Sequence, residues 1–124
     1  MAAVQGIVIK RIYEPAAATD GYRVLVDRLW PRGLAKSAAQ LDDWLKDVAP
    51  SPELRHWFGH DPARFSAFEQ RYRAELDENP AVATLLERAA AGRLTLLYGA
   101  RDETHNQARV LAAYLTEKQQ KKKS

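Results

Sequence analysis

Residues 23–34, Arg23-Val-Leu-Val-Asp-Arg-Leu-Trp-Pro-Arg-Gly-Leu34, join a short apolar segment to a group of charged residues. The apolar segment, Val24 to Val26, predicts a buried β-strand, and the Pro-Arg-Gly turn that follows cannot continue it. In α/β proteins, ligands bind in the crevice beyond the carboxyl ends of the strands. We therefore expect Asp27, Arg28 and Arg32 to lie at a ligand site.

A second segment of the same construction, Leu94-Thr-Leu-Leu-Tyr-Gly-Ala-Arg-Asp102, lies near the C-terminus. Gly99 is small enough to let a ligand approach the backbone, and Arg101 is a bidentate donor suited to phosphate or carboxylate. A helix expected to begin near Thr104 presents free N–H groups and a positive dipole end to this loop. If the two strands are parallel, both charged loops lie at one end of the sheet, and an anion fits between them.

The order of the expected elements indicates an α/β fold with a small, mainly parallel sheet of about three strands, flanked by about five helices. The strands are expected at residues 6–13, 22–27 and 94–98. Helices are expected to begin at the capping residues Ser37, Ser51, Asp61, Asn79 and Thr104.

Three local predictions depend on helix-capping patterns. Residues 37–40 have the Ser-x-x-Gln pattern of a capping box, and Leu41, Trp44, Leu45 and Val48 follow at helical spacing as far as Pro50. Residues 104–107 have the pattern Thr-x-x-Gln and predict a second capping box at the start of the last helix. Gly92 lies where a left-handed C-terminal cap is needed.

Composition limits the classes of protein to which the chain can belong. A length of 124 residues predicts one domain, over residues 1–117, followed by a disordered lysine-rich tail over residues 118–124. Without cysteine, the chain has no disulfides, thiolate catalysis or cysteine-bound metal. It also lacks a signal peptide and an apolar run of about 18 residues, so we expect a cytoplasmic location without membrane contact.

The net charge of +3 includes four lysines of the tail, Lys118, Lys121, Lys122 and Lys123, so the rest of the chain is near −1 (+3 − 4 = −1). A body of that charge argues against a DNA-coating protein. A weak contact between the tail lysines and the nucleic-acid backbone is one interpretation, and a solvated end without a partner is the other.

Several residues of the expected site have two interpretations. Trp30 stacks on a base or sugar, or it packs into the core. His60 is a polar site residue, or it assists the cap at Asp61. A metal site that includes His56 and His60 is not favoured, because Gly59 and Pro62 interrupt the helix that would align the two rings. No motif for a nucleotide cofactor or a serine nucleophile is present, and no cofactor is expected.

Three functions fit these residues. The first is a binding or regulatory module that holds a phosphate- or carboxylate-bearing small molecule, such as a nucleotide, or a nucleic-acid end in a cleft made by Arg28, Arg32, Arg101, Asp102 and Asn106. The second is an enzyme acting on nucleotides or nucleic acid, with Asp27 or Asp102 as general base and the arginines stabilising negative charge. The third is a structural protein, in which Asp27 pairs with Arg101 and Asp102 with an arginine of the first loop.

Residues 26–34, 49–62 and 95–102, together with Asn106, resemble the YeaO-like bacterial proteins, a branch of a family labelled a domain of unknown function. The resemblance extends from the first strand to Leu115, and it implies a small cytoplasmic α/β protein of uncharacterised activity. Other branches of that family carry cysteines in the loop that matches residues 99–106, whereas this chain has none. The strand, loop and helix at residues 98–107 also resemble the anion cradle of rhodanese and cysteine-phosphatase folds, with Gly99 near the position of their thiol.

Overall fold

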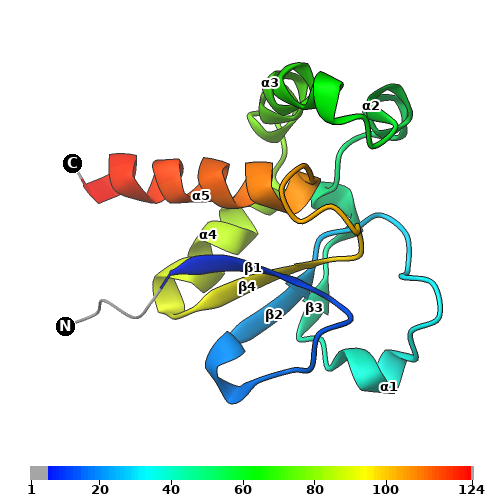
Figure 1. Ribbon diagram of the computed structural model, residues 1–124. Helices are drawn as coiled ribbons and strands as arrows, with labels where there is room; N and C mark the ends of the chain where they lie inside the picture. The colour runs from blue at the N-terminus through cyan, green and yellow to red at the C-terminus, as the bar shows by residue number, and fades with distance from the viewer. Residues whose placement is uncertain (1–5, 124) are drawn as a thin grey trace.

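A computed structural model describes residues 6–123 and shows one fully parallel sheet of four strands (Figure 1). The strands are β1 (Ile7–Arg11), β2 (Tyr22–Leu25), β3 (Asp43–Trp44) and β4 (Leu94–Tyr98), and their order across the sheet is β1-β4-β2-β3. The expectation of a mainly parallel sheet of about three strands is confirmed, and the additional strand is only two residues long.

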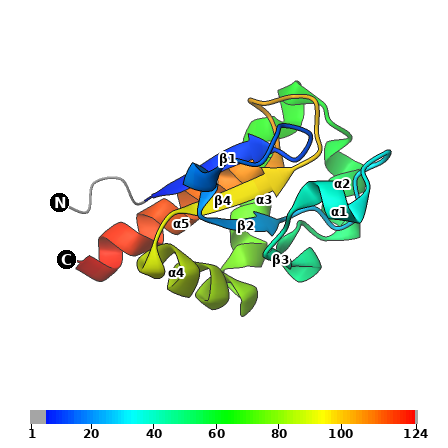
Figure 2. The same ribbon diagram turned by 90° about the horizontal axis from the view of Figure 1, so that it is seen from below.

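Five α-helices accompany the sheet in this part of the chain: α1 (Lys36–Ala39), α2 (Pro52–Phe58), α3 (Phe65–Leu76), α4 (Ala81–Ala91) and α5 (Gln107–Lys123). Three short 3-10 helices, η1 (Ala18–Asp20), η2 (Lys46–Val48) and η3 (Pro62–Arg64), lie in the connections. Helices α4 and α5 lie along one side of the sheet and α1 on the other, while α2 and α3 lie together on the α5 side, next to the start of α5 (Figures 1 and 2).

Successive residues of β2 and β4 supply two different cores, because side chains alternate across a strand. Val24 and Leu96 belong to a large core shared with helices α2 to α5. Leu25 and Leu97 belong to a smaller core on the opposite face, which Trp30, Leu34, Leu41 and Trp44 help to cover. The sheet is therefore buried on both faces, as expected for parallel strands.

The helix expected at residues 37–49 is wrong. Helix α1 ends at Ala39, because Gln40 adopts a left-handed conformation with φ of 49°. The chain then turns back to the sheet, where Trp44 pairs with Leu25 as part of β3. The indole N–H of Trp44 donates a hydrogen bond to the backbone oxygen of Asp27 at 2.7 Å. Strand pairing and this bond outweigh the local helical spacing.

Two of the expected helix caps also differ from the structure. Helix α5 begins at Gln107, and its cap is Asn106, whose Oδ1 accepts a hydrogen bond from the N–H of Arg109. The capping box expected at residues 104–107 is therefore wrong. Gly92 has an extended conformation, with φ of 164°, and is not a left-handed cap. The caps at the two ends of α2 are confirmed: Ser51 accepts a hydrogen bond from Leu54, and Gly59 is left-handed.

Helix α5 runs through Lys123 and includes residues 118–123, which the sequence placed in a disordered tail; Ser124 lies outside the described residues. The helix starts beside the carboxyl ends of the strands and runs back along the sheet, so its lysine-rich end lies at the other end of the molecule (Figure 1). None of the described helices is both long and apolar enough to cross a membrane.

Candidate functional site

The loops that follow β2 and β4 meet at the carboxyl ends of these two neighbouring strands. The N–H of Val26 extends the ladder to the backbone oxygen of Leu97 at 3.0 Å. One residue further, the carboxylate of Asp27 accepts a hydrogen bond from the N–H of Gly99 at 2.9 Å. Its other oxygen accepts a hydrogen bond from the side-chain amide of Gln107, the first residue of α5. The sequence could not establish whether these loops converge, and the parallel pairing of β2 with β4 brings them together.

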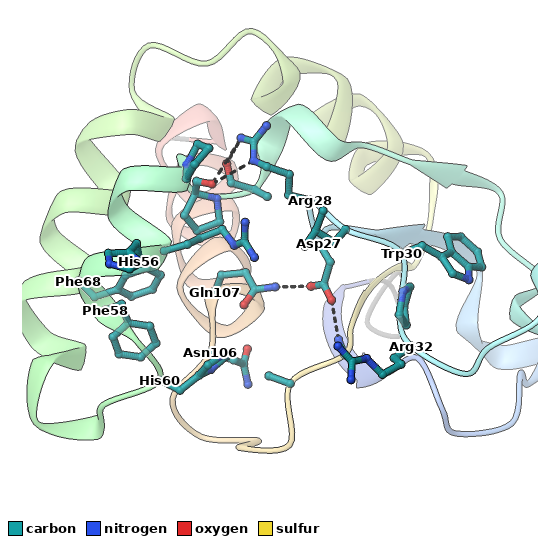
Figure 3. A pocket seen from close by; sticks show the side chains of 18 of the residues that line it. Asp27, Arg28, Trp30, Arg32, His56, Phe58, His60, Phe68, Asn106 and Gln107 are labelled. Carbon is teal, nitrogen blue, oxygen red and sulfur yellow. Dashed lines mark hydrogen bonds between the residues drawn. The ribbon is translucent and has the colours of Figure 1, made fainter.

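A cavity of about 540 Å³ opens at this junction (Figure 3). Its lining comes from the loop after β2, from α2 and the segment before it, from the loop after β4, and from the start of α5. In Figure 3, Asp27 and Gln107 lie between the side chains of Phe58 and Phe68 on one side and those of Trp30 and Arg32 on the other. The cavity thus lies between the sheet and the α2–α3 pair.

Asp27 is the only carboxylate among the described residues that line the cavity. Burial raises the pKa of this carboxyl from 3.8 to about 6. The hydrogen bonds from Gly99 and Gln107 act in the opposite direction, as do the positive charges of Arg55 and His60. The half-buried location of Asp27 therefore disfavours its charged form, while two hydrogen bonds fix its orientation. Near neutral pH the carboxyl is ionised and accepts both of these bonds.

Basic side chains surround this carboxylate. Among the described residues, three arginines and two histidines line the cavity: Arg28, Arg32, Arg55, His56 and His60. The guanidinium of Arg28 donates hydrogen bonds to the backbone oxygens of Ala49 and Pro50, at 3.3 and 3.4 Å. In contrast, no described residue forms a hydrogen bond or an ion pair with the guanidinium of Arg32 or Arg55, and both side chains are exposed. The guanidinium groups of Arg32 and Arg55 are therefore available to bind a ligand.

Apolar side chains form much of the remaining wall. Phe58 and Phe68 are almost fully buried and stack with their ring centroids 4.3 Å apart. Trp30 also lines the cavity, and its indole N–H donates a hydrogen bond to the backbone oxygen of Leu34 while its ring packs against Trp44. Trp30 therefore packs against the protein, as one of its two interpretations expected, and stacking on a base or sugar stays a prediction.

The structure brings together seven of the nine residues assigned to the site from sequence: Asp27, Arg28, Trp30, Arg32, His60, Gly99 and Asn106. Arg101 and Asp102 do not line the cavity. Asp102 accepts hydrogen bonds from the backbone N–H groups of Thr104 and His105 and contacts the His105 ring, and these bonds hold the pKa of its carboxyl below the usual value. No ion pair joins Asp27 to Arg101 within the described chain. The hydrogen bond from the N–H of Gly99 to Asp27 joins the two loops in place of the expected ion pair.

Asn106 lines the cavity mainly as a structural residue. Its side chain is 1% exposed, donates a hydrogen bond to the backbone oxygen of Asp102, and accepts the capping bond from Arg109. The backbone of the same loop accepts two hydrogen bonds from Arg11, at Gly99 and Ala100. These contacts hold the loop between β4 and α5 in place.

Sequence reasoning missed Arg55 and gave Gln107 a capping role. Arg55 lies on α2, in the long connection between β2 and β4, so a rule based on strand ends cannot find it. The available signal was the short helix that follows the cap at Ser51, which places Arg55 and His56 near the buried Phe58. Within residues 6–123, no group of three or more His, Asp or Glu side chains is arranged to hold a metal ion.

The fold and the cavity define a small, parallel α/β protein with a basic cavity at the strand ends. The chain matches, over residues 6–124, the family model described as the inactive DUF488-N3 subclade, and it belongs to this family. It is 46% identical to the uncharacterized protein YeaO of Escherichia coli strain K12 over 110 residues. These residues are 88% of this chain and 96% of that protein. The expected membership of the YeaO-like family is thereby confirmed.

Mycobacterial relatives are similar over nearly the same length. The uncharacterized protein Rv3073c of Mycobacterium tuberculosis strain H37Rv is 42% identical over 107 residues, which are 86% of this chain and 91% of that protein. The uncharacterized protein Mb3100c of Mycobacterium bovis has the same identity and coverage. No solved structure matches the chain significantly.

Proposed function

We propose that this protein binds a small molecule carrying a phosphate or carboxylate group in the cavity at the carboxyl ends of β2 and β4. The observation that carries the proposal is the excess of positive groups around the cavity. The guanidinium groups of Arg32 and Arg55 form no hydrogen bond or ion pair with a described residue, and such groups form bidentate bonds with phosphate and carboxylate. A protein with a cytoplasmic location would meet many such anions.

Binding without conversion is the form of the proposal that the site favours. A general base needs an oxygen that can approach the proton of a substrate. Asp102, one of the two expected bases, lies outside the cavity. Asp27, the other, accepts hydrogen bonds from Gly99 and Gln107, and these bonds stabilise the charged carboxylate and weaken it as a base. The description of the matched family as an inactive subclade agrees with a binding role.

One observation favours a second candidate, an enzyme that acts on nucleotides or nucleic acid by acid–base chemistry. Burial raises the pKa of Asp27 to about 6, and perturbed carboxyl groups in clefts are a common feature of catalytic sites. This candidate predicts that Asp27→Asn retains the ligand but turns none of it over.

A thermal-shift experiment tests the main proposal. The probes are inorganic phosphate, succinate, nucleoside monophosphates and short single-stranded DNA, each at about 50 and 200 mM salt to separate site binding from screened surface contacts. A probe at about 100 times its dissociation constant stabilises the native state by roughly 2.7 kcal/mol, which is a readily measured shift for a domain of this size. Single-stranded DNA also tests the separate prediction that the lysine-rich end contacts nucleic acid.

The variants are Arg32→Ala and Arg55→Ala, and Arg101→Ala is the matched control. Arg101 is an exposed arginine near the same strand ends that does not line the cavity. We expect the first two variants to lose most of the shift and the control to retain it. Equal losses in all three variants would mean that the anion binds through general surface charge, and no shift in the wild type would contradict the proposal.

A further inference from the structure

The anion cradle expected at the start of α5 is filled by a group of the protein itself. The N–H of Gly99 and the side chain of Gln107 both donate hydrogen bonds to the carboxylate of Asp27. An external phosphate or carboxylate at this position would meet a fixed negative charge, which disfavours it. The anionic part of a ligand therefore belongs elsewhere in the cavity.

The Asp27 end of the cavity offers hydrogen-bond acceptors. Each carboxylate oxygen has about two lone-pair positions, and each accepts one bond from the protein. The Oε1 atom of Gln107 accepts no hydrogen bond from any described residue, since only its Nε2 is engaged, with Asp27. Acceptors grouped in this way are complementary to N–H groups of a ligand, such as an amino group or the N–H edge of a base.

The opposite character is found on other walls of the same cavity. Arg32 and Arg55 are exposed and unpaired within the described chain, and they provide donors for an anionic group. Figure 3 shows Arg32 on the side of the loop after β2, and Phe58 and Phe68 across the cavity from it. The cavity thus has an acceptor region and a cationic region, and the rings of Phe58 and Phe68 close it on a further side while remaining almost fully buried.

From this arrangement we propose that the ligand is a bipolar molecule, with N–H donors that face Asp27 and Gln107, an organic body that fills the cavity between its two ends, and a phosphate or carboxylate held by Arg32 and Arg55. Nucleoside monophosphates and aromatic amino acids share this chemistry. The cavity of about 540 Å³ is far larger than a single phosphate needs and lies within the range of sites for small organic ligands. This inference rests on the proposed function, because it uses the same cavity and the same arginines.

Calorimetric titration of the wild-type protein with whole ligands and with their fragments tests the inference. The whole ligands are GMP, AMP, UMP and tryptophan; the fragments are guanosine, inorganic phosphate and acetate. We expect at least one whole ligand to bind at least about tenfold more tightly than either of its fragments, because both ends contribute to the same complex. Comparison of the dissociation constants of GMP and tryptophan shows whether the anionic group of the ligand is a phosphate or a carboxylate.

Two variants assign the ends of the ligand. Asp27→Asn is expected to weaken binding of the whole ligand by about tenfold or more, as for the loss of a charged hydrogen-bond acceptor, and to leave phosphate binding equal or tighter. Arg55→Ala is expected to weaken both the whole ligand and phosphate. A thermal melt of each variant confirms that it is folded, and the comparison of whole ligands with fragments needs no variant.

The possible failures are distinguishable. If phosphate binds as tightly as GMP and both depend on Arg32 and Arg55, the proposed anion site stands and the bipolar ligand is wrong. The bipolar ligand is also wrong if Asp27→Asn tightens the whole ligand and phosphate by the same factor. If no whole ligand and no fragment binds to the wild type, both the proposed function and this inference are overturned.

Discussion

The carboxylate of Asp27 and the backbone N–H of Gly99 lie 2.9 Å apart and connect the residues that follow two adjacent parallel strands. A Cβ atom at position 99 would lie 3.1 Å from Oδ2 of Asp27, which is tighter than an ordinary contact. Glycine therefore permits the approach of the carboxylate to the backbone. This bond fixes Asp27, the one acidic side chain that the described residues contribute to the cavity, among basic groups, so its protonation state affects both the stability and the charge of the site.

Asp27→Asn is expected to change the pH dependence of stability. Burial raises the pKa of Asp27 to about 6 in the native state, above the value of 3.8 for an ordinary Asp. Between these two pH values the native state binds more protons than the unfolded chain, so this group lowers the free energy of unfolding as the pH rises. Below about pH 4 the Asp27 carboxyl does not lower the free energy of unfolding, and above about pH 6 it lowers it by the full amount.

The measurement is chemical denaturation of the wild type and Asp27→Asn at several pH values from 4 to 8. Relative to the variant, the wild type should lose roughly 1–3 kcal/mol of stability between about pH 4 and 6.5 and no more above that range. The comparison cancels the titration of all other groups, because they are present in both proteins. Parallel stability curves would show that Asp27 titrates at its ordinary pH in the folded protein.

The parts of the fold that follow from local patterns were predictable. Val24, Leu25 and Leu96 lie in apolar runs flanked by turns, and the structure places all three in buried central strands. Ser51 and Gly59 define α2 by capping chemistry that depends on neighbouring residues alone. Local chemistry is enough where no distant partner competes with it.

Long-range pairing explains the largest error in the expected fold. The apolar spacing around Trp44 is compatible with a helix, yet the N–H of Asp42 bonds to Arg23 and Trp44 pairs with Leu25. Neither partner can be identified from the sequence near residue 44. The left-handed conformation of Gln40 ends α1 before this segment, and a glutamine gives little indication of such a conformation.

The site was predictable only as far as the strand ends define it. Asp27, Arg32 and Gly99 follow β2 and β4 directly, and a parallel sheet places them at one edge. Arg55 reaches the same cavity from the helical connection, through the tertiary packing of α2 and α3. Arg101 has the right position in the sequence, but its loop directs it away from the cavity lining, and only the folded loop shows this.

Tyr72→Phe is expected to destabilise the protein and to disturb one wall of the cavity. The hydroxyl of Tyr72 donates a hydrogen bond of 2.6 Å to the backbone oxygen of Val48, and its side chain is 1% exposed. The bond ties α3 to the segment that leads to the cavity residues Ala49 and Pro50. Its loss leaves a buried carbonyl without a partner, which costs about 1–3 kcal/mol and is measurable by urea denaturation.

Tyr13→Phe is the matched control for this substitution. The hydroxyl of Tyr13 also donates to a backbone oxygen, that of Arg32, at 2.8 Å, but Tyr13 is 43% exposed. Water can replace the lost bond there, so we expect a change of less than about 0.5 kcal/mol. A loss in Tyr13→Phe as large as that in Tyr72→Phe would show that burial does not determine the cost of these two bonds.

Asp20→Asn is expected to cause a large loss of stability at neutral pH, and Asp61→Asn a small one. Both aspartates pair with an arginine three residues later. The Asp20–Arg23 pair is buried, with an N–O distance of 2.5 Å, whereas Asp61 and Arg64 are half-exposed and 3.8 Å apart. Loss of the charge at Asp20 leaves Arg23 buried without its counter-ion, at a cost of about 3 kcal/mol; the exposed pair contributes less than about 1 kcal/mol.

The pH dependence of this difference identifies its cause. Burial alone would raise the pKa of Asp20, but hydrogen bonds from the Ala17 N–H, Lys10 and Arg23 outweigh it and hold the pKa below 3.8. The stabilisation by Asp20 is therefore complete above about pH 4 and is lost as the pH falls below that value. Urea denaturation at pH 7 and at about pH 3 should show a large difference between wild type and Asp20→Asn at the higher pH and a smaller one at the lower pH. A difference of equal size at both pH values would mean that the shape of the side chain, and not its charge, stabilises this part of the fold.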